Sequence, residues 1–191
     1  MGKFSTEVSK QLPGSKNRPY EVVEYDNNWP LLYEQYAQKI KSIFGEELLE
    51  IHHFGSTSIP GMFAKPNIDI YVVVKDLARI KELYSQMETG GYTYHGDYCK
   101  IGEEYFTLDT ELGERIASIH VFDSPTVTIG YKNFRDYLEE FPEERGRYIA
   151  LKKELFEKYR DDYRSYDSGK KELIDELKAK ANEWAGKKIV S

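Results

Sequence analysis

The run from Asn67 to Val74 constrains the fold more than any other part of the chain. It is almost wholly apolar and β-branched, which is typical of a strand that is buried on both faces. We therefore expect this strand to lie in the centre of a sheet. Asp69 interrupts the run, and an unpaired carboxylate there would carry a large desolvation penalty. Asp69 therefore needs a partner, which could be a metal ion, a basic side chain such as Lys65, or a hydrogen-bond network.

Strand and helix patterns alternate around this run. Short strands are predicted over 20–24, 48–54, 92–98, 105–109 and 115–122. Apolar residues at helical spacing predict one helix over 29–44 and a second from Asp76, as N-cap, to Gly90. From Gly130 onward the pattern is helical, with breaks at Pro142 and Gly169. These patterns predict an α/β (α+β) protein with a mixed sheet flanked by helices and a helical C-terminal third. Short connections predict antiparallel pairing of the last three strands.

The size and composition of the chain limit its class. Its 191 residues, 40% of them hydrophobic, suit a single domain, expected over 19–187 after a flexible tail of residues 1–18. The single cysteine, Cys99, excludes an internal disulfide and favours a cytoplasmic location. No apolar stretch reaches the roughly 18 residues of a membrane span. A net charge of −6 argues against a nucleic-acid partner. The oligomeric state stays open.

A glycine- and hydroxyl-rich segment precedes the buried strand. Gly55 allows a ligand to approach the backbone, and Ser56, Thr57 and Ser58 offer hydroxyl and N–H groups of the kind that hold phosphate oxygens. A plain turn is the alternative. The segment lacks the Gly-Lys-Ser/Thr ending of a Walker A loop. We therefore expect residues 51–75 to form a phosphate-binding pocket at a sheet edge.

Several motifs follow one another along the chain, first Gly-Ser-Thr-Ser-Ile-Pro-Gly from Gly55, then Ala64-Lys65-Pro66 and Ile68-Asp69-Ile70. In this order they resemble the signature of the GrpB family, which belongs to the nucleotidyltransferase superfamily. The resemblance extends over residues 20–185, through Ile119-His120-Val121-Phe122, Phe134-Arg135-Asp136-Tyr137-Leu138, Leu151-Lys152, and Tyr166 with Lys170. It implies a polymerase-β-like fold in which Gly-Ser occupies a helical turn facing nucleotide phosphates.

The resemblance also implies a metal site, and here the chain departs from the pattern. Active nucleotidyltransferases carry two carboxylates one residue apart, because residues i and i+2 share a sheet face and together hold Mg²⁺. Asp69 matches the first position and is the candidate Mg²⁺ ligand and catalytic residue. Tyr71 stands at the second position, where a phenol binds hard cations poorly. Candidate replacements on later strands are Glu104, Asp109 and Asp123.

The resemblance carries further candidate residues. His120 is the second candidate catalytic residue, as a ligand or an acid–base group, although a strand histidine is more often structural. The candidate phosphate-binding residues are Gly55, Ser56, Thr57, Lys65, Arg135, Lys152 and Lys170. Asp136 is expected to orient Arg135 through a salt bridge. His52 and His53 are adjacent on a strand and cannot both ligate one metal.

Three functions fit these residues. The leading one is binding of a nucleoside triphosphate or another phosphorylated small molecule, with possible transfer of a nucleoside monophosphate to a small acceptor. The second is a non-catalytic nucleotide-binding or regulatory module, which the missing carboxylate favours. The third is a metal-independent enzyme in which His120 is the general base.

Overall fold

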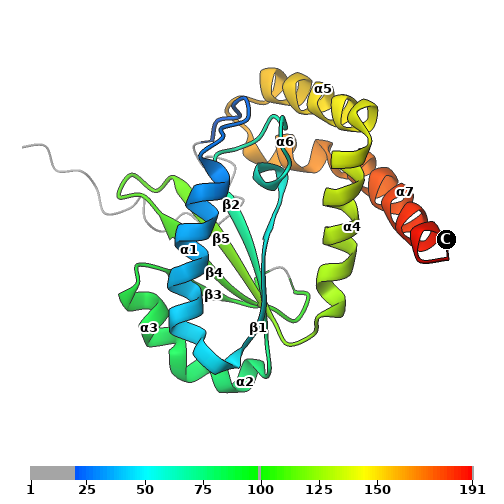
Figure 1. The fold of residues 1–191 in the computed structure, drawn as a ribbon. Helices are drawn as coiled ribbons and strands as arrows, with labels where there is room; N and C mark the ends of the chain where they lie inside the picture. The colour runs from blue at the N-terminus through cyan, green and yellow to red at the C-terminus, as the bar shows by residue number, and fades with distance from the viewer. Residues whose placement is uncertain (1–19, 99, 191) are drawn as a thin grey trace, which may run out of the picture.

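The computed structural model describes residues 20–98 and 100–190 (Figure 1). The predicted tail of residues 1–18 and Cys99 lie outside the described residues. Within these ranges, five strands form one mixed sheet in the order β1-β2-β5-β4-β3. The strands are β1 (Leu48–Phe54), β2 (Ile68–Val74), β3 (Thr93–Gly96), β4 (Glu104–Asp109) and β5 (Arg115–Phe122).

The helices flank this sheet and extend beyond it. Figure 1 shows α1, α2 and α3 on one side of the sheet and α4 on the other, with α5, α6 and α7 continuing from α4. Their bounds are α1 (Trp29–Phe44), α2 (Leu77–Ile80), α3 (Tyr84–Thr89), α4 (Thr126–Glu140), α5 (Pro142–Lys158), α6 (Tyr163–Gly169) and α7 (Lys171–Val190). Three short 3₁₀ turns are η2 (Gly45–Glu47), η3 (Ser56–Ser58) and η4 (Lys81–Leu83). In the described part of the chain, no helix is both long and apolar enough to cross a membrane.

The pairing of the strands confirms the predicted mixed sheet. β2 pairs antiparallel with β1 and parallel with β5. β4 pairs antiparallel with both β3 and β5, as the short connections predict. β2 is an interior strand, but the centre of the sheet is β5, because β4 and β3 add beyond β5.

The hydrophobic core occupies one face of the sheet. Alternate residues of β2, namely Ile68, Ile70 and Val72, point into a cluster that includes Ile40 of α1 and Met87 of α3. All five side chains are at most 1% exposed. Because side chains alternate along a strand, Asp69 and Tyr71 point to the opposite face. That opposite face carries the candidate site.

The C-terminal helices have hydrophobic clusters of their own. One cluster joins α4, α5 and α7 around Leu138, Tyr148 and Leu177, and another surrounds Leu155 and Tyr166 of α5 and α6. The helical third is therefore fixed by its own packing. It can hold polar side chains over the sheet without contributing to the core beneath the sheet.

Four predicted elements differ from the structure. The strand predicted over 20–24 is a single bridge between Val23 and Ala64, because the chain turns at Asp26 to enter α1. The helix predicted from Asp76 to Gly90 is capped by Asp76 as expected, but η4 divides it into α2 and α3. The first helix of the C-terminal third starts at Thr126, before the predicted Gly130, and the strand predicted over 92–98 is shorter.

Candidate functional site

A pocket of about 530 Å³ lies over the polar face of the sheet, beneath the C-terminal helices. Asp69 and Tyr71 of β2 and Ser118 and His120 of β5 line it from the sheet, and residues of α4 to α7 line it from the other side. This volume falls within the range of about 300–1,000 Å³ that is usual for small-molecule sites. The sequence predicted a pocket at the sheet edge, whereas the structure has it on the face, because the helical third contributes its second wall.

Gly55 and η3 place the backbone directly against Asp69. Gly55 has a φ of 72°, and a Cβ added there would lie 2.1 Å from the Asp69 Oδ2. Only glycine fits such a conformation and such a gap. Ser56 then begins η3, so the Gly-Ser pair sits on a helical turn, as the resemblance implied. Gly55, Ser56 and Thr57 all line the pocket.

Thr57 has a mainly structural position although it lines the pocket. It is 1% exposed, and its hydroxyl donates to the Asn67 carbonyl at 3.0 Å. The His53 Nε2 lies 3.0 Å from the same hydroxyl. Thr57 therefore ties the turn to the start of β2.

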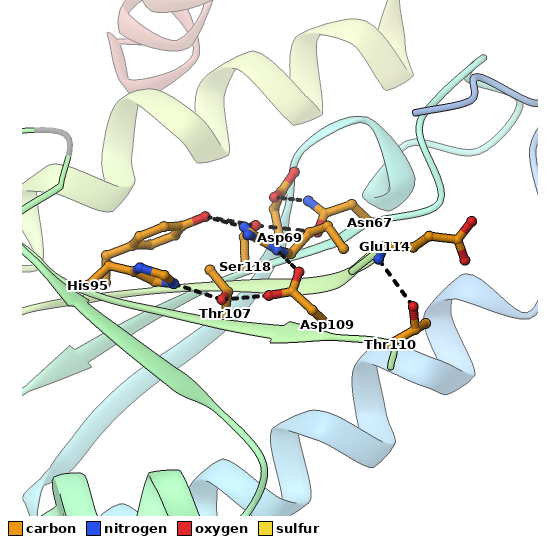
Figure 2. A network of polar contacts seen from close by, with 10 residues as sticks. Asn67, Asp69, His95, Thr107, Asp109, Thr110, Glu114 and Ser118 are labelled. Carbon is orange, nitrogen blue, oxygen red and sulfur yellow. Dashed lines mark hydrogen bonds and ion pairs between the residues drawn. The ribbon is translucent and has the colours of Figure 1, made fainter. Parts of the chain in front are cut away.

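Asp69 is held by a hydrogen-bond network, which was one of its three predicted partners. Asn67 Nδ2 donates to Asp69 Oδ1 at 2.5 Å, and Ser118 donates to Asn67 Oδ1 at 3.3 Å. Figure 2 shows how the network continues across the sheet through a tyrosine and an arginine to Asp109, Thr107 and His95. Burial raises the pKa of the Asp69 carboxyl above its usual 3.8, and His120 and Lys65 oppose this rise.

The two-carboxylate arrangement for magnesium is not formed. Tyr71 shares the pocket face with Asp69, and its ring packs 4.6 Å from the rings of both His120 and Tyr131. In the part of the chain that the structure describes, no group of three His, Cys, Asp or Glu side chains could hold a metal ion. The donor set thus does not fit the two-metal clamp, and a single Mg²⁺ at Asp69 stays a prediction.

The three candidates for the second carboxylate do not line the pocket. Glu104 accepts a hydrogen bond from the hydroxyl of Tyr94, on the side of the sheet away from the pocket. Asp109 forms an ion pair with Arg115. Asp123 follows β5 and is exposed. Their positions follow from the alternation of side chains along β4 and from the end of β5 at Phe122.

Lys152 is the most unusual side chain of the site. It is 2% exposed, and its Nζ lies 2.6 Å from both the Ser56 Oγ and the Phe63 carbonyl oxygen. Burial lowers the pKa of Lys152 well below 10.5, and the charges of Lys170 and Lys65 lower it further. Lys152 therefore links α5 to the Gly-Ser turn at a point where positive charge accumulates.

The other predicted cations also line this pocket. Lys65 contacts the Tyr163 hydroxyl at 2.5 Å, Lys170 pairs with Asp167 at 2.8 Å, and Arg135 pairs with Asp136 at 2.8 Å as expected. Lys178 of α7, which the sequence did not single out, joins them and lies over the Tyr131 ring. All four predicted cations thus converge from segments that are distant in sequence.

Lys178 lies at helical spacing after Lys170 and Ile174, which both line the pocket. On an otherwise charged helix face, that spacing was the one available sign of its position.

His120 has a buried partner that sequence reasoning missed. Its Nδ1 lies 2.5 Å from the Glu103 Oε2, and the side chain of Glu103 is 0% exposed. His120 itself lines the pocket, and its ring lies between those of Tyr71 and Tyr105, at 4.6 and 4.7 Å. Glu103 precedes β4 in a Gly-Glu-Glu sequence, where nothing distinguishes a buried glutamate from an exposed one.

The two adjacent histidines of β1 do not line the pocket. His53 stacks on Tyr33 of α1 at 4.8 Å, and its burial lowers its pKa from 6.5 to about 4. His52 lies on the other face and pairs with Glu50 at 2.7 Å. They point in opposite directions, as strand alternation predicts.

Comparison with known proteins identifies the family. The model of the family described as GrpB protein matches residues 19–180. The UPF0157 protein YqkA of Bacillus subtilis is 33% identical over 168 residues, which cover 87% of this chain and 48% of that protein. The glutamate-rich protein GrpB of Alkalihalophilus pseudofirmus is 35% identical over 162 residues, which cover 82% of this chain and 92% of that protein.

A solved structure of a GrpB protein also matches this chain. The crystal structure of the conserved protein GrpB from Enterococcus faecalis has a TM-score of 0.76 and 32% identity, and the match covers 84% of this chain and 98% of that chain. The present chain spans about half the length of the Bacillus subtilis relative and nearly all of the other two. On the family match, the sequence identity and the shared fold, this chain is a member of the GrpB family.

Proposed function

We propose that the pocket binds a nucleotide or another phosphorylated small molecule in the cytoplasm. The observation that carries the proposal is the local charge. Five cationic side chains and two carboxylates line the pocket, which leaves an excess of three positive charges in a chain of net charge −6. The cations are Lys65, Arg135, Lys152, Lys170 and Lys178, and the carboxylates are Asp69 and Asp167.

This excess is the same whether the two most buried groups are both charged or both neutral. The pKa of Lys152 is lowered and that of Asp69 is raised, so both shifts favour the neutral forms. If both groups are neutral, four cations face one carboxylate and the excess is unchanged. Phosphate groups, which carry several negative charges and strong acceptor oxygens, suit such a surface.

The arrangement also supports a group-transfer reaction. In this reaction the Ser56 hydroxyl would donate to a phosphate oxygen, and the lysines and Arg135 would neutralise charge on a leaving pyrophosphate. Aromatic rings of α4, including Tyr131 and Phe134, also line the pocket, and a base can pack against them. The reaction we propose is transfer of a nucleoside monophosphate to a small acceptor. None of these roles requires Mg²⁺.

Calorimetric titration with ATP and with inorganic pyrophosphate tests the proposal. We expect both to bind, and we expect Arg135→Gln and Lys178→Gln each to weaken binding about tenfold, as for the loss of one charge-assisted hydrogen bond. Lys39→Gln is the matched control, because Lys39 is an exposed lysine of α1 outside the pocket. Absence of binding by both ligands, or equal weakening by the control, contradicts the proposal.

The same titration tests the single magnesium ion. If Asp69 holds Mg²⁺, the ion should strengthen ATP binding in the wild type and not in Asp69→Asn. An equal effect in both proteins would mean that Mg²⁺ travels with the nucleotide and does not contact Asp69.

A non-catalytic nucleotide-binding module is the second candidate. Tyr71 in place of the second carboxylate is the observation that favours it. Tight ATP binding without release of pyrophosphate in the presence of a range of small alcohols would support the module over the transferase.

A further inference from the structure

The contact between Glu103 and His120 joins a buried carboxyl group to an imidazole ring that lines the pocket. The exposed fractions of the two side chains are 0% and 14%. His120 lines the pocket, whereas Glu103 lies behind it. Packing therefore hides the acid and leaves the histidine accessible to a ligand.

The contact selects one tautomer of His120. With Glu103 ionised, its carboxylate can only accept hydrogen bonds, and the Nδ1 that lies 2.5 Å from it then carries the proton. The neutral ring then has its lone pair on Nε2. The rings of Tyr71 and Tyr105, one on each neighbouring strand, hold the imidazole in place from two sides.

His120 also lies close to Asp69 on the pocket face of the sheet. Tyr71 is its register partner on β2, and Asp69 shares the pocket face one pleat away. A ligand that fills the pocket over Asp69 is thus within reach of His120.

We propose that His120 is a proton acceptor for a hydroxyl group of an alcohol bound in this pocket, and that Glu103 is the residue that positions it. The inference rests on the proposed nucleotide site. His120 Nε2 takes the hydroxyl proton, and the oxygen's electron pair forms a bond to the α-phosphorus of the nucleoside triphosphate. The bond from that phosphorus to pyrophosphate breaks, and the imidazolium returns its proton to water. Glu103 stabilises the imidazolium in between.

A structural role for the pair makes different predictions. A histidine that only stabilises the sheet needs no free Nε2 facing a ligand, and its reactivity would not respond to nucleotide. The tautomer and the nucleophilicity of His120 therefore separate the two roles without knowledge of the acceptor.

The experiment combines two readouts on the whole chain. Nitrogen-15 NMR of labelled histidines should show the Nδ1–H tautomer for His120. Carbethoxylation by diethyl pyrocarbonate at neutral pH, located by peptide mass spectrometry, should modify His120. Glu103→Gln should slow that reaction about tenfold, the order expected from one charge-assisted hydrogen bond. Saturating ATP should protect His120.

Glu104→Gln is the matched control. Glu104 is the next residue in the chain, but it bonds to Tyr94 and does not line the pocket. It should leave the tautomer and the reaction rate of His120 unchanged. If Glu103→Gln does not fold, the tautomer of His120 in the wild type and its protection by ATP still distinguish the proton acceptor from a structural histidine.

The outcomes separate this inference from the proposed function. An Nε2–H tautomer in the wild type, or the same rate in Glu103→Gln, overturns the inference. ATP that binds by calorimetry but does not protect His120 also overturns it and leaves the nucleotide site intact. If the tautomer and rates are as expected but ATP does not bind, the acid–base pair stands and the nucleotide proposal fails.

Discussion

The two faces of the sheet differ in what covers them and in what they carry. On one face, Ile70 of β2 and Ile119 of β5 meet the apolar sides of α1, α2 and α3 in a core whose buried residues are at most 3% exposed. On the other, Asp69 and Ser118, which are paired in register, line a pocket beneath helices that form separate clusters. One strand thus contributes to stability through one set of alternate residues and to the site through the other.

The difference shows how the chain separates stability from chemistry. Apolar packing is non-directional, so the core face is held by burial alone. The pocket face cannot be closed in the same way without removing the site. Hydrogen bonds hold the pocket face instead of apolar packing, such as those from the Asn67 amide to Asp69 and from the Lys152 amine to Ser56. Substitutions on the two faces should therefore have different effects.

The largest effect on stability is expected on the core face. Ile70→Ala should lower the free energy of unfolding by about 2–5 kcal/mol, because it removes fully buried methyl groups and leaves a cavity. Ser118→Ala on the pocket face should cost only about 1 kcal/mol, the contribution of a hydroxyl hydrogen bond. Urea denaturation measures both. Equal losses would mean that the faces do not differ as described.

A smaller loss of stability is expected at Gly55, where the backbone lies against the Asp69 carboxylate on the pocket face. Gly55 and Gly61 both have a positive φ, but only at Gly55 would a Cβ meet another atom, the Asp69 carboxylate. Gly61→Ala should cost about 1 kcal/mol from backbone strain, and Gly55→Ala about 3 kcal/mol.

Gly55→Ala should also abolish pyrophosphate binding, because the clash of the added methyl with Asp69 displaces the turn that carries Ser56. Thermal denaturation and calorimetry test the pair of variants. If the two alanines behave alike, the close approach of Gly55 to Asp69 is not what requires glycine.

The smallest change in stability is expected at Asp69, and there the substitution should increase stability. Because burial raises the pKa of this carboxyl above 3.8, the folded state binds the proton more tightly than the unfolded state. Its contribution to stability is therefore present at acid pH and is lost as the pH rises above 3.8 through the folded pKa. Asp69→Asn should be more stable than the wild type at neutral pH by less than about 1 kcal/mol.

The pH dependence checks this prediction. The stability curves of the wild type and Asp69→Asn should converge at acid pH and separate as the pH rises. A variant that is less stable than the wild type at neutral pH would show that the carboxylate is favourably held, and would weaken the contrast between the faces.

Local patterns in the sequence determined most of the fold. The predicted strands over 48–54 and 115–122 and the helix over 29–44 match β1, β5 and α1 to the residue. They were predictable because a strand or helix buried on one side repeats its apolar residues at a fixed period. The 20–24 segment failed because its alternation is short and its partner, Ala64, belongs to an irregular loop.

The sequence also determined which residue types gather at the site. The turn that begins at Gly55 and the carboxylate at Asp69 follow from local geometry, and the family resemblance added Arg135, Lys152 and Lys170. Their roles in binding and catalysis stay predictions.

Only the tertiary structure decided how these residues meet. It placed α4 to α7 over one face of the sheet, buried Lys152 against Ser56, and set Glu103 behind His120. A period of two or 3.6 residues specifies which side of an element is apolar, but it carries no information on which distant polar side chain will lie opposite. Those pairings depend on loop paths and helix packing across the whole chain, which is why the pocket's chemistry emerged only in three dimensions.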